Sequence, residues 1–153
     1  MPSQQAIHDL MAQIGPVLDL AKVTEFSEEA SWHLAFDADI GMDIEYDPDG
    51  ERVMITGGIA AEPTNREKVY EALLHYNYLW TEHGGVRAAL DGLPGHLVLM
   101  LEVPISRLEM SYLCAVLQNF RTVIEGWQVI LKDNAIKKET AVLPIHMTGI
   151  IRC

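Results

Sequence analysis

The residues most suggestive of chemistry are carboxylates in a short acidic segment of the chain. Glu45, Asp47, Asp49 and Gly50 match the first oxygen positions and the glycine of a calcium-binding loop. Counted from Glu45, however, position 12 is Thr56, whereas such a loop needs a bidentate acid there. The sequence Asp-Pro-Asp-Gly is also typical of a hairpin turn. A turn between two strands therefore explains these residues without a metal ion.

Other catalytic and metal-binding signatures are missing from the sequence. None of the six histidines has the H-x-x-x-H or H-E-x-x-H spacing of a zinc site, and the two cysteines form no C-x-x-C pair. The chain also has no G-x-S-x-G nucleophile motif and no G-x-x-x-x-G-K phosphate loop. We therefore expect no cofactor, no metal and no enzymatic activity. A pair of carboxylates could escape such motifs, so a hydrolytic or small-molecule-binding α+β domain stays open as an alternative.

The charge of the chain restricts its partners. Its 153 residues carry a formal net charge of −11, and residues 25–51 contain ten Asp or Glu but no Lys or Arg. Nucleic acid and anionic membranes are disfavoured because phosphate binding requires Lys and Arg. A basic protein segment is a compatible partner. The longest apolar run is too short to cross a bilayer, and the first residues lack the basic start of a signal peptide, so we expect a cytoplasmic protein.

Hydrophobic periodicity predicts an α+β fold with the order α-β-β-β-α-β-β-α. Helical spacing favours three helices, whereas alternation of apolar and polar residues favours an antiparallel five-stranded sheet. Residues 17–29 have neither pattern and are expected to form a loop. Residues 1–133 are expected to form a single domain, and residues 134–153 a C-terminal tail that is docked or flexible. The helices are expected at 4–14, 64–85 and 105–132, and the strands at 31–36, 40–46, 52–56, 86–90 and 96–103.

The central helix, residues 64–85, has more apolar surface than one contact can bury. Thr64 and Glu67 have the spacing of a capping box at its start, and Gly84 and Gly85 supply a left-handed end. The helix carries two apolar stripes, although one stripe suffices to dock a helix on a sheet. The second stripe therefore needs another surface, which could be a second copy of the chain. That stripe consists of Tyr70, Leu74 and Tyr78.

Two further surfaces are apolar beyond what a monomer needs to bury. The strand at 96–103 carries Val98 and Met100 on the face opposite its other apolar residues, and the short first helix has four large apolar residues. We interpret the chain as a homodimer with apolar grooves for an extended segment of another protein. Strand addition beside apolar pockets is an established mode of recognition. Closure of all these surfaces within one monomer is the alternative.

The sequence resembles the type III secretion chaperones of the Tir-chaperone (CesT-like) family. Three stretches carry the resemblance: GMDIEYDPDGERVMITGGI, YEALLHYNYLWTEHGGVRAALD, and HLVLMLEVPIS with the helix after it. The middle stretch has the pattern LL-x-x-N-x-L…GG…LD at Leu73, Leu74, Asn77, Leu79, Gly84, Gly85, Leu90 and Asp91. The resemblance covers residues 4–132 in order and spacing, and we recognise no counterpart for residues 134–153.

This resemblance implies a small acidic homodimer that binds the N-terminal segment of a secreted effector and keeps it secretion-competent. The export ATPase complex is an implied further partner. The implied dimer interface lies at the central helix and neighbouring strands, with candidates Tyr70, Leu74, Tyr78, Val98 and Met100. The implied effector groove lies at the first helix and the sheet, with candidates Ile7, Leu10, Met11, Ile14, Trp32 and Leu34. The two helix stripes could be exchanged between surfaces, and a dimeric adaptor of the same fold in another pathway is the alternative function.

Overall fold

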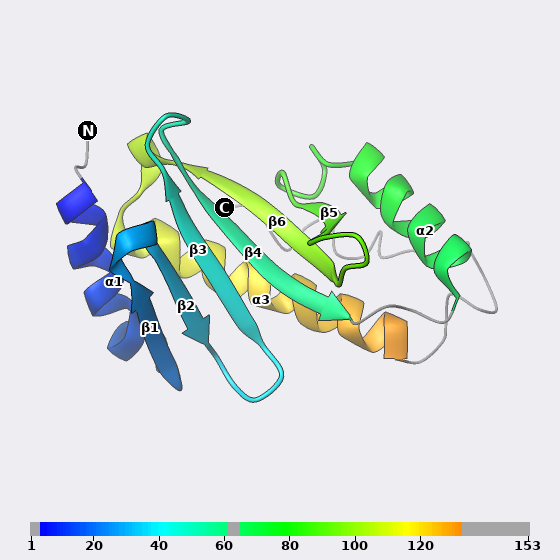
Figure 1. Ribbon diagram of the computed structural model, residues 1–153, viewed down its shortest axis with the longest axis horizontal. Helices are drawn as coiled ribbons and strands as arrows, with labels where there is room; N and C mark the ends of the chain where they lie inside the picture. The colour runs from blue at the N-terminus through cyan, green and yellow to red at the C-terminus, as the bar shows by residue number, and fades with distance from the viewer. Residues whose placement is uncertain (1–3, 61–64, 133–153) are drawn as a thin grey trace.

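The computed structural model describes residues 4–60 and 65–132, and it confirms the α+β fold class. In this part of the chain, three helices accompany a single antiparallel sheet (Figure 1). The helices are α1 (Gln4–Leu18), α2 (Arg66–Tyr78) and α3 (Met110–Lys132), with short 3₁₀ turns at Ser27–Glu29 and Ile105–Arg107. The strands are β1 (Lys22–Phe26), β2 (Ser31–Ala35), β3 (Gly41–Asp47), β4 (Arg52–Ala60), β5 (Arg87–Leu90) and β6 (Leu97–Pro104). The expected tail, residues 134–153, lies outside the described residues.

The sheet has six strands within the described residues rather than the five expected, in the order β1-β2-β3-β4-β6-β5. The additional strand is β1, which lies in the segment expected to be a loop. Its apolar residues, Val23 and Phe26, are three positions apart, so the alternation that marks the other strands is missing. Val23 lies opposite Leu34 of β2. The strand is therefore defined by its pairing with β2, which sequence periodicity does not report.

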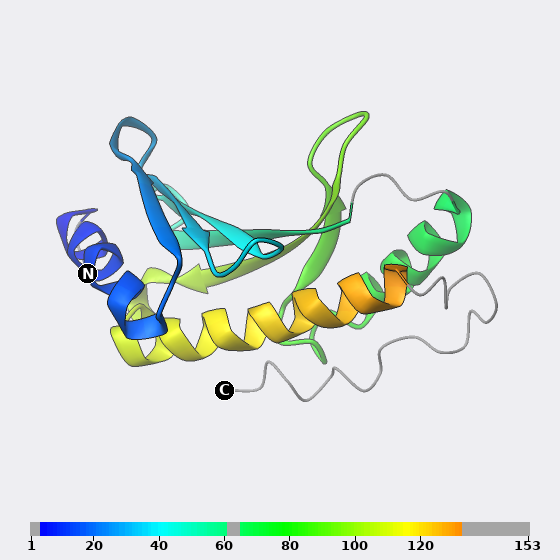
Figure 2. The same ribbon diagram turned by 90° about the horizontal axis from the view of Figure 1, so that it is seen from below.

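Helices cover one face of the sheet, and no described element covers the other (Figure 2). α3 runs along the covered face, where Phe120 and Ile124 approach Gly57 of β4 so closely that a side chain at that position would clash. α1 packs beside α3 at the β1 end of the sheet, and α2 lies at the opposite end next to β5. The two ends of the sheet are thus flanked by different helices.

α1 is four residues longer than expected, because Gly15 and Pro16 do not end it. The helix ends in a Schellman motif in which Asp19 is left-handed, with φ 52°. The amide of Leu20 donates to the carbonyl of Gly15 at 2.9 Å, and the amide of Asp19 donates to the carbonyl of Pro16 at 3.4 Å. This short connection returns the chain directly into β1, so that α1 and β1 lie side by side.

The other two helices are shorter than their apolar periodicity predicts. α2 ends at Tyr78, and the left-handed Gly84 and Gly85, with φ 66° and 89°, end the turn that follows it rather than the helix itself. Thr64, the expected cap of α2, lies outside the described residues. α3 begins at Met110 instead of residue 105, because residues 105–107 form a separate 3₁₀ turn. Periodicity detected the buried faces within the bounds of α2 and α3, but not where each hydrogen-bonded helix begins or ends.

Candidate functional site

Most of the candidate groove residues belong to the hydrophobic core of the chain. Buried side chains at these positions are Ile7, Met11 and Ile14 of α1 and Trp32 and Leu34 of β2, whereas Leu10 is partly buried against them. Residues this deeply buried stabilise the fold first of all, because their apolar surface is already removed from water. Their contact with an effector stays a prediction, and a partner would have to reach them through surface depressions.

One such depression lies between α1 and β1. It has a volume of about 280 Å³ and is lined by Met11, Ala12, Gly15, Pro16, Val23, Glu25 and Trp32. Met11 and Trp32 are therefore the candidate groove residues that it reaches. The Nδ1 atom of His8 on α1 lies 2.7 Å from Oε1 of Glu25 on β1, and this contact links the two elements. The depression combines apolar walls with a carboxylate.

β1 is the edge strand on this side of the sheet. It pairs with β2 along one side, and along its other side no described strand pairs with it. An exposed edge presents backbone amides and carbonyls that another extended chain can bind. Glu25 lies on β1, and Glu28 and Glu29 follow in the next turn, all of them exposed. The edge is therefore acidic and adjacent to the apolar depression.

Leu34→Ala is expected to lower the free energy of unfolding by about 2–5 kcal/mol, because it leaves a cavity in the core. Leu34 is 0% exposed. Phe26→Ala on the neighbouring strand is a suitable control, since Phe26 is exposed and its loss is expected to cost less than about 1 kcal/mol. Urea unfolding followed by circular dichroism measures both. An unchanged midpoint for Leu34→Ala would contradict the core position of this side chain.

The outer stripe of α2 is exposed, as the two-stripe pattern predicts. Leu74 is 67% exposed and Tyr78 is 80% exposed, whereas Tyr70 is half-buried. An apolar hollow of about 250 Å³ between α2 and β5 is lined by Tyr70, Leu73, Leu74, Asn77, Ala88, Ala89, Leu90 and Leu97. Three of the candidate dimer residues thus lie together on one side of α2. Whether a second copy covers them stays a prediction.

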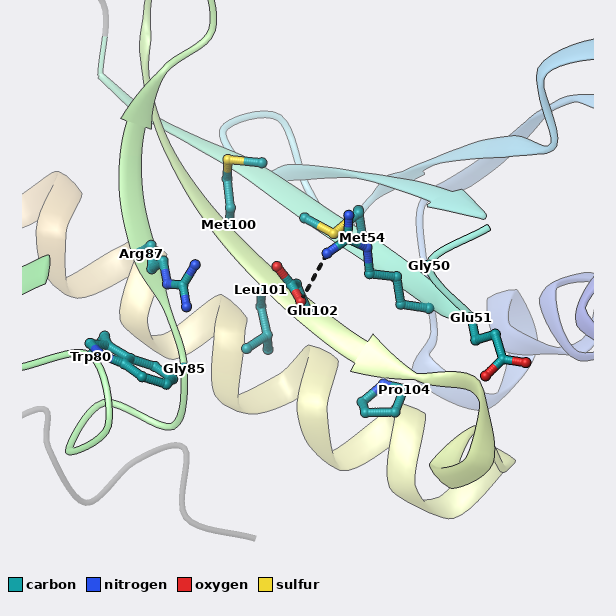
Figure 3. Close-up of a pocket in the computed structure, with 11 residues that line it drawn as sticks. Gly50, Glu51, Met54, Trp80, Gly85, Arg87, Met100, Leu101, Glu102 and Pro104 are labelled. Atoms are coloured by element: carbon teal, nitrogen blue, oxygen red, sulfur yellow. Dashed lines mark ion pairs between the residues drawn. The ribbon is translucent and has the colours of Figure 1, made fainter. Parts of the chain in front are cut away.

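The other two candidate dimer residues lie on β6. Met100 is half-buried and lines a pocket of about 390 Å³ together with Met54 and Trp80 (Figure 3). Val98, in contrast, is buried within the monomer. A partner that approaches the open face of the sheet can contact Met100 directly but not Val98.

Sequence reasoning did not single out two residues of this pocket, Trp80 and Arg87. The guanidinium carbon of Arg87 lies 4.8 Å from the centre of the Trp80 ring, a cation–π contact. Trp80 belongs to the turn after α2, and Arg87 begins β5. The helix expected at residues 64–85 included Trp80. Because α2 ends at Tyr78, Trp80 instead projects beside the open face of the sheet.

The β5 edge of the sheet is closed by a side chain of α2. The Asn77 amide nitrogen donates to the carbonyl of Ala88 at 3.0 Å, and the Ala88 amide donates to the Asn77 carbonyl oxygen at 2.7 Å. Asn77 thus makes both hydrogen bonds that a neighbouring strand would make to Ala88. The two sheet edges are therefore unequal: β5 is capped at Ala88, whereas no described strand pairs with the outer side of β1.

Asn77→Ala is expected to lower the free energy of unfolding by about 1–3 kcal/mol, because it leaves the amide and carbonyl of Ala88 without these partners. Gln118→Ala, on the exposed surface of α3, is a matched control expected to change stability by less than about 0.5 kcal/mol. Chemical denaturation gives both values. Equal stabilities of the two variants would contradict a structural role for the Asn77 amide.

The acidic hairpin serves as a turn in the described structure. The Asp47 carboxylate accepts hydrogen bonds from the Gly50 amide at 3.0 Å and from Nε of Arg52 at 2.8 Å, and these contacts lower the pKa of Asp47. Across residues 4–60 and 65–132, no three His, Cys, Asp or Glu side chains come close enough together to hold a metal ion. In the same residues, no helix is long and apolar enough to cross a membrane.

Comparison with known proteins decides the family. The model of the Tir chaperone protein (CesT) family matches residues 9–128, which is most of the chain. The chain belongs to the Tir chaperone (CesT) family. The resemblance carried by the hairpin, the central helix and the last strand and helix is thereby confirmed. The CesT match includes β1 and the whole sheet, and none of the curated protein sequences matches the chain.

Several solved structures share this CesT-family fold. The ExsC–ExsE complex has a chain that superposes with a TM-score of 0.74 at 20% identity, covering 86% of this chain and 97% of that one. A chain of the HopA1–SchA chaperone–effector complex superposes with a TM-score of 0.67 at 17% identity, covering 82% of this chain and 94% of that one. The structure of the Yersinia pestis type III secretion chaperone SycH in complex with a fragment of YscM2 has a TM-score of 0.59 at 17% identity. The match covers 78% of this chain and 97% of that one. At such identities the likeness establishes the fold.

Proposed function

We propose that this chain is a cytoplasmic, non-enzymatic homodimeric chaperone that binds an extended segment of a secreted effector and keeps it secretion-competent. The observation that carries the proposal is the apolar depression between α1 and β1, which lies beside the open edge of the sheet. An extended segment can use both features at once. Its backbone pairs with an edge strand while alternate side chains enter a pocket.

The client is expected to pair with β1 and to place an apolar side chain against Met11 and Trp32. The edge strand and the turn after it carry Glu25, Glu28 and Glu29, all exposed. Basic residues flanking the apolar side chain of the client would complement this charge. Such complementarity speeds the encounter and favours the correct partner more than it increases affinity.

The proposed homodimer forms through the outer stripe of α2. Leu74 and Tyr78 are large apolar side chains that a monomer leaves in water. The hollow beside them accepts apolar groups, and Met100 lies on the open face of the sheet at the same end. A two-fold contact of this kind uses the same patch on both copies. It leaves the α1–β1 depression, at the opposite end of the sheet, free for the client.

Family membership supports this function, since the family consists of chaperones. One similar structure holds a chaperone with its effector, and another holds a type III secretion chaperone with a protein fragment. On the basis of the same family membership, we propose the export ATPase complex as a further partner. An enzymatic role lacks support, since the family to which the chain belongs consists of chaperones.

Co-expression with the protein encoded next to this chain tests the proposal. The neighbour is expected to be soluble, and to purify with the chain, only when the two are produced together. Limited proteolysis of the complex is expected to protect a segment near the N-terminus of the neighbour. If the neighbour and the secreted proteins of the same organism behave identically with and without the chain, the proposed function is wrong.

A further inference from the structure

Three aromatic side chains meet where α2, the turn after it and α3 come together. The rings of Tyr76 and His83 are stacked with their centroids 4.0 Å apart and an interplanar angle of 11°. The ring of Trp127 meets Tyr76 edge-on, at 5.3 Å and 89°. His83 is only 2% exposed, although it lies in a connecting turn, and Tyr76 and Trp127 are buried as well. The turn is thus attached to the core through an ionisable side chain.

Each side chain of this cluster has one polar atom that is buried without a hydrogen-bond partner among the described residues. The Tyr76 hydroxyl, Nδ1 of His83 and Nε1 of Trp127 make no hydrogen bond within the described residues. A neutral imidazole can be buried there at the cost of one unmade hydrogen bond. A protonated imidazole would add a buried positive charge, which costs far more unless a carboxylate pairs with it.

Burial has a larger effect on His83 than the charged groups around it in the described part of the chain. Glu82, the preceding residue, favours the protonated form, and His75 on α2 opposes it. Of the other two rings in the cluster, Tyr76 on α2 has a pKa raised by burial and stays neutral, and Trp127 on α3 carries no charge. Burial has the largest effect, so the pKa of His83 lies below its ordinary value of about 6.5.

We propose that the cluster of Tyr76, His83 and Trp127 is a proton-sensitive latch that holds α2 and the following turn against α3. Neutral His83 keeps its ring stacked in the core. Once protonated, it leaves the cluster for water and withdraws the turn, and α2 loses its anchor on Trp127. The further consequence, weakening of the dimer in mild acid, rests on the proposed function because the dimer is assigned to α2.

The direction of the pH effect follows from the burial. Because the pKa of His83 is lower in the folded state than in the unfolded state, the unfolded state binds the proton more tightly. The latch therefore contributes its full stabilisation above about pH 6.5, the ordinary pKa of histidine. That stabilisation is lost as the pH falls through the lowered pKa of folded His83. Between these two pKa values the opening equilibrium increases by about tenfold for each pH unit, and below the lower one it stays constant.

Hydrogen exchange of wild type and His83→Phe between neutral pH and about pH 5 tests the latch. Phenylalanine keeps the aromatic stack but cannot be protonated. Protection factors, which correct for the intrinsic pH dependence of exchange, are compared for residues 66–78 of α2 and residues 110–132 of α3. In wild type, acidification is expected to lower the protection factors of α2 about tenfold more than those of α3. In His83→Phe, the protection factors of the two helices are expected to fall by the same factor.

His75→Phe is the matched control, because His75 is an exposed histidine on the same helix. In His75→Phe, α2 is expected to lose more protection than α3 on acidification, as in wild type. If His83→Phe does not fold, His83→Gln serves instead, since glutamine is polar and neutral at every pH. The latch is overturned if the non-titrating variant shows the wild-type pH dependence, or if α2 and α3 of wild type lose protection equally.

The proposed latch and the proposed homodimer can be tested separately. Light scattering at neutral pH reports the dimer alone, and a monomer there contradicts the proposed function without affecting the latch. Exchange measured in the Leu74→Asp background, which is expected to be monomeric, reports the latch alone. Loss of α2 protection in acid is expected to persist in that variant, and its absence would overturn the latch even if the wild type is dimeric.

Discussion

Replacing Leu74 with aspartate is expected to convert the homodimer into a folded monomer. Leu74 is exposed in the monomer, so the new carboxylate stays in water there and costs the fold little. In a dimer that covers α2, the same carboxylate is buried among apolar side chains, at a cost of several kcal/mol. Because 1.4 kcal/mol corresponds to a factor of ten, the dissociation constant is expected to rise by at least about a hundredfold.

Gel filtration coupled to light scattering measures this change at micromolar concentration. The wild type is expected at twice the chain mass of 17.1 kDa, and Leu74→Asp at the mass of one chain. Val129→Asp is the matched control, because Val129 is a similarly exposed apolar residue on α3, outside the proposed interface. It is expected to stay dimeric. A Leu74→Asp variant that elutes as a dimer would place the interface elsewhere.

Replacing Ala12 with arginine is expected to abolish retention of the client. Ala12 is exposed on α1 and lines the depression between α1 and β1, so the long charged side chain would occupy the space meant for an apolar side chain. Exclusion of the client's apolar side chain from the depression removes its burial there, even where the arginine pairs with Glu25, which also lines the depression. We expect client affinity to fall by at least about a hundredfold, with the dimer and the thermal stability unchanged.

Gln13→Arg separates steric blocking from the change of charge. Gln13 is the next residue of the same exposed helix surface but does not line the depression. Its substitution adds the same positive charge to an acidic chain and is expected to leave client binding within about threefold of wild type. Co-purification followed by calorimetry on the isolated complexes measures both variants. An equal loss of client affinity in Ala12→Arg and Gln13→Arg would indicate a charge effect and contradict the assigned pocket.

The sequence was sufficient for those parts of the fold that leave a local pattern. Alternation along β3 and the two apolar stripes of α2 both follow from which side chains avoid water. The exposure of Leu74 and Tyr78 could be anticipated for the same reason. The strand β1 could not be predicted from the sequence, since its five residues owe their conformation to pairing with β2 rather than to their own periodicity.

The candidate site was less predictable than the fold because apolar residues at a surface and in a core look alike in sequence. Ile7, Ile14 and Leu34 are candidate groove residues, and their side chains are buried in the hydrophobic core. Their contact with an effector stays a prediction. The depression itself depends on how α1 packs against β1. That packing follows from the left-handed Asp19, a residue that sequence patterns do not mark.

The most direct test of the account is hydrogen exchange of the chain with and without the client isolated by co-expression. The client is expected to protect the amides of β1, whose outer side pairs with no described strand, and to leave those of β5 unchanged apart from the effects of dimerisation. Exchange of β1 is expected to slow by at least about tenfold, since a paired edge strand forms new backbone hydrogen bonds. If β1 exchanges equally fast in the complex, the client does not bind at this edge, and the proposed binding site is wrong.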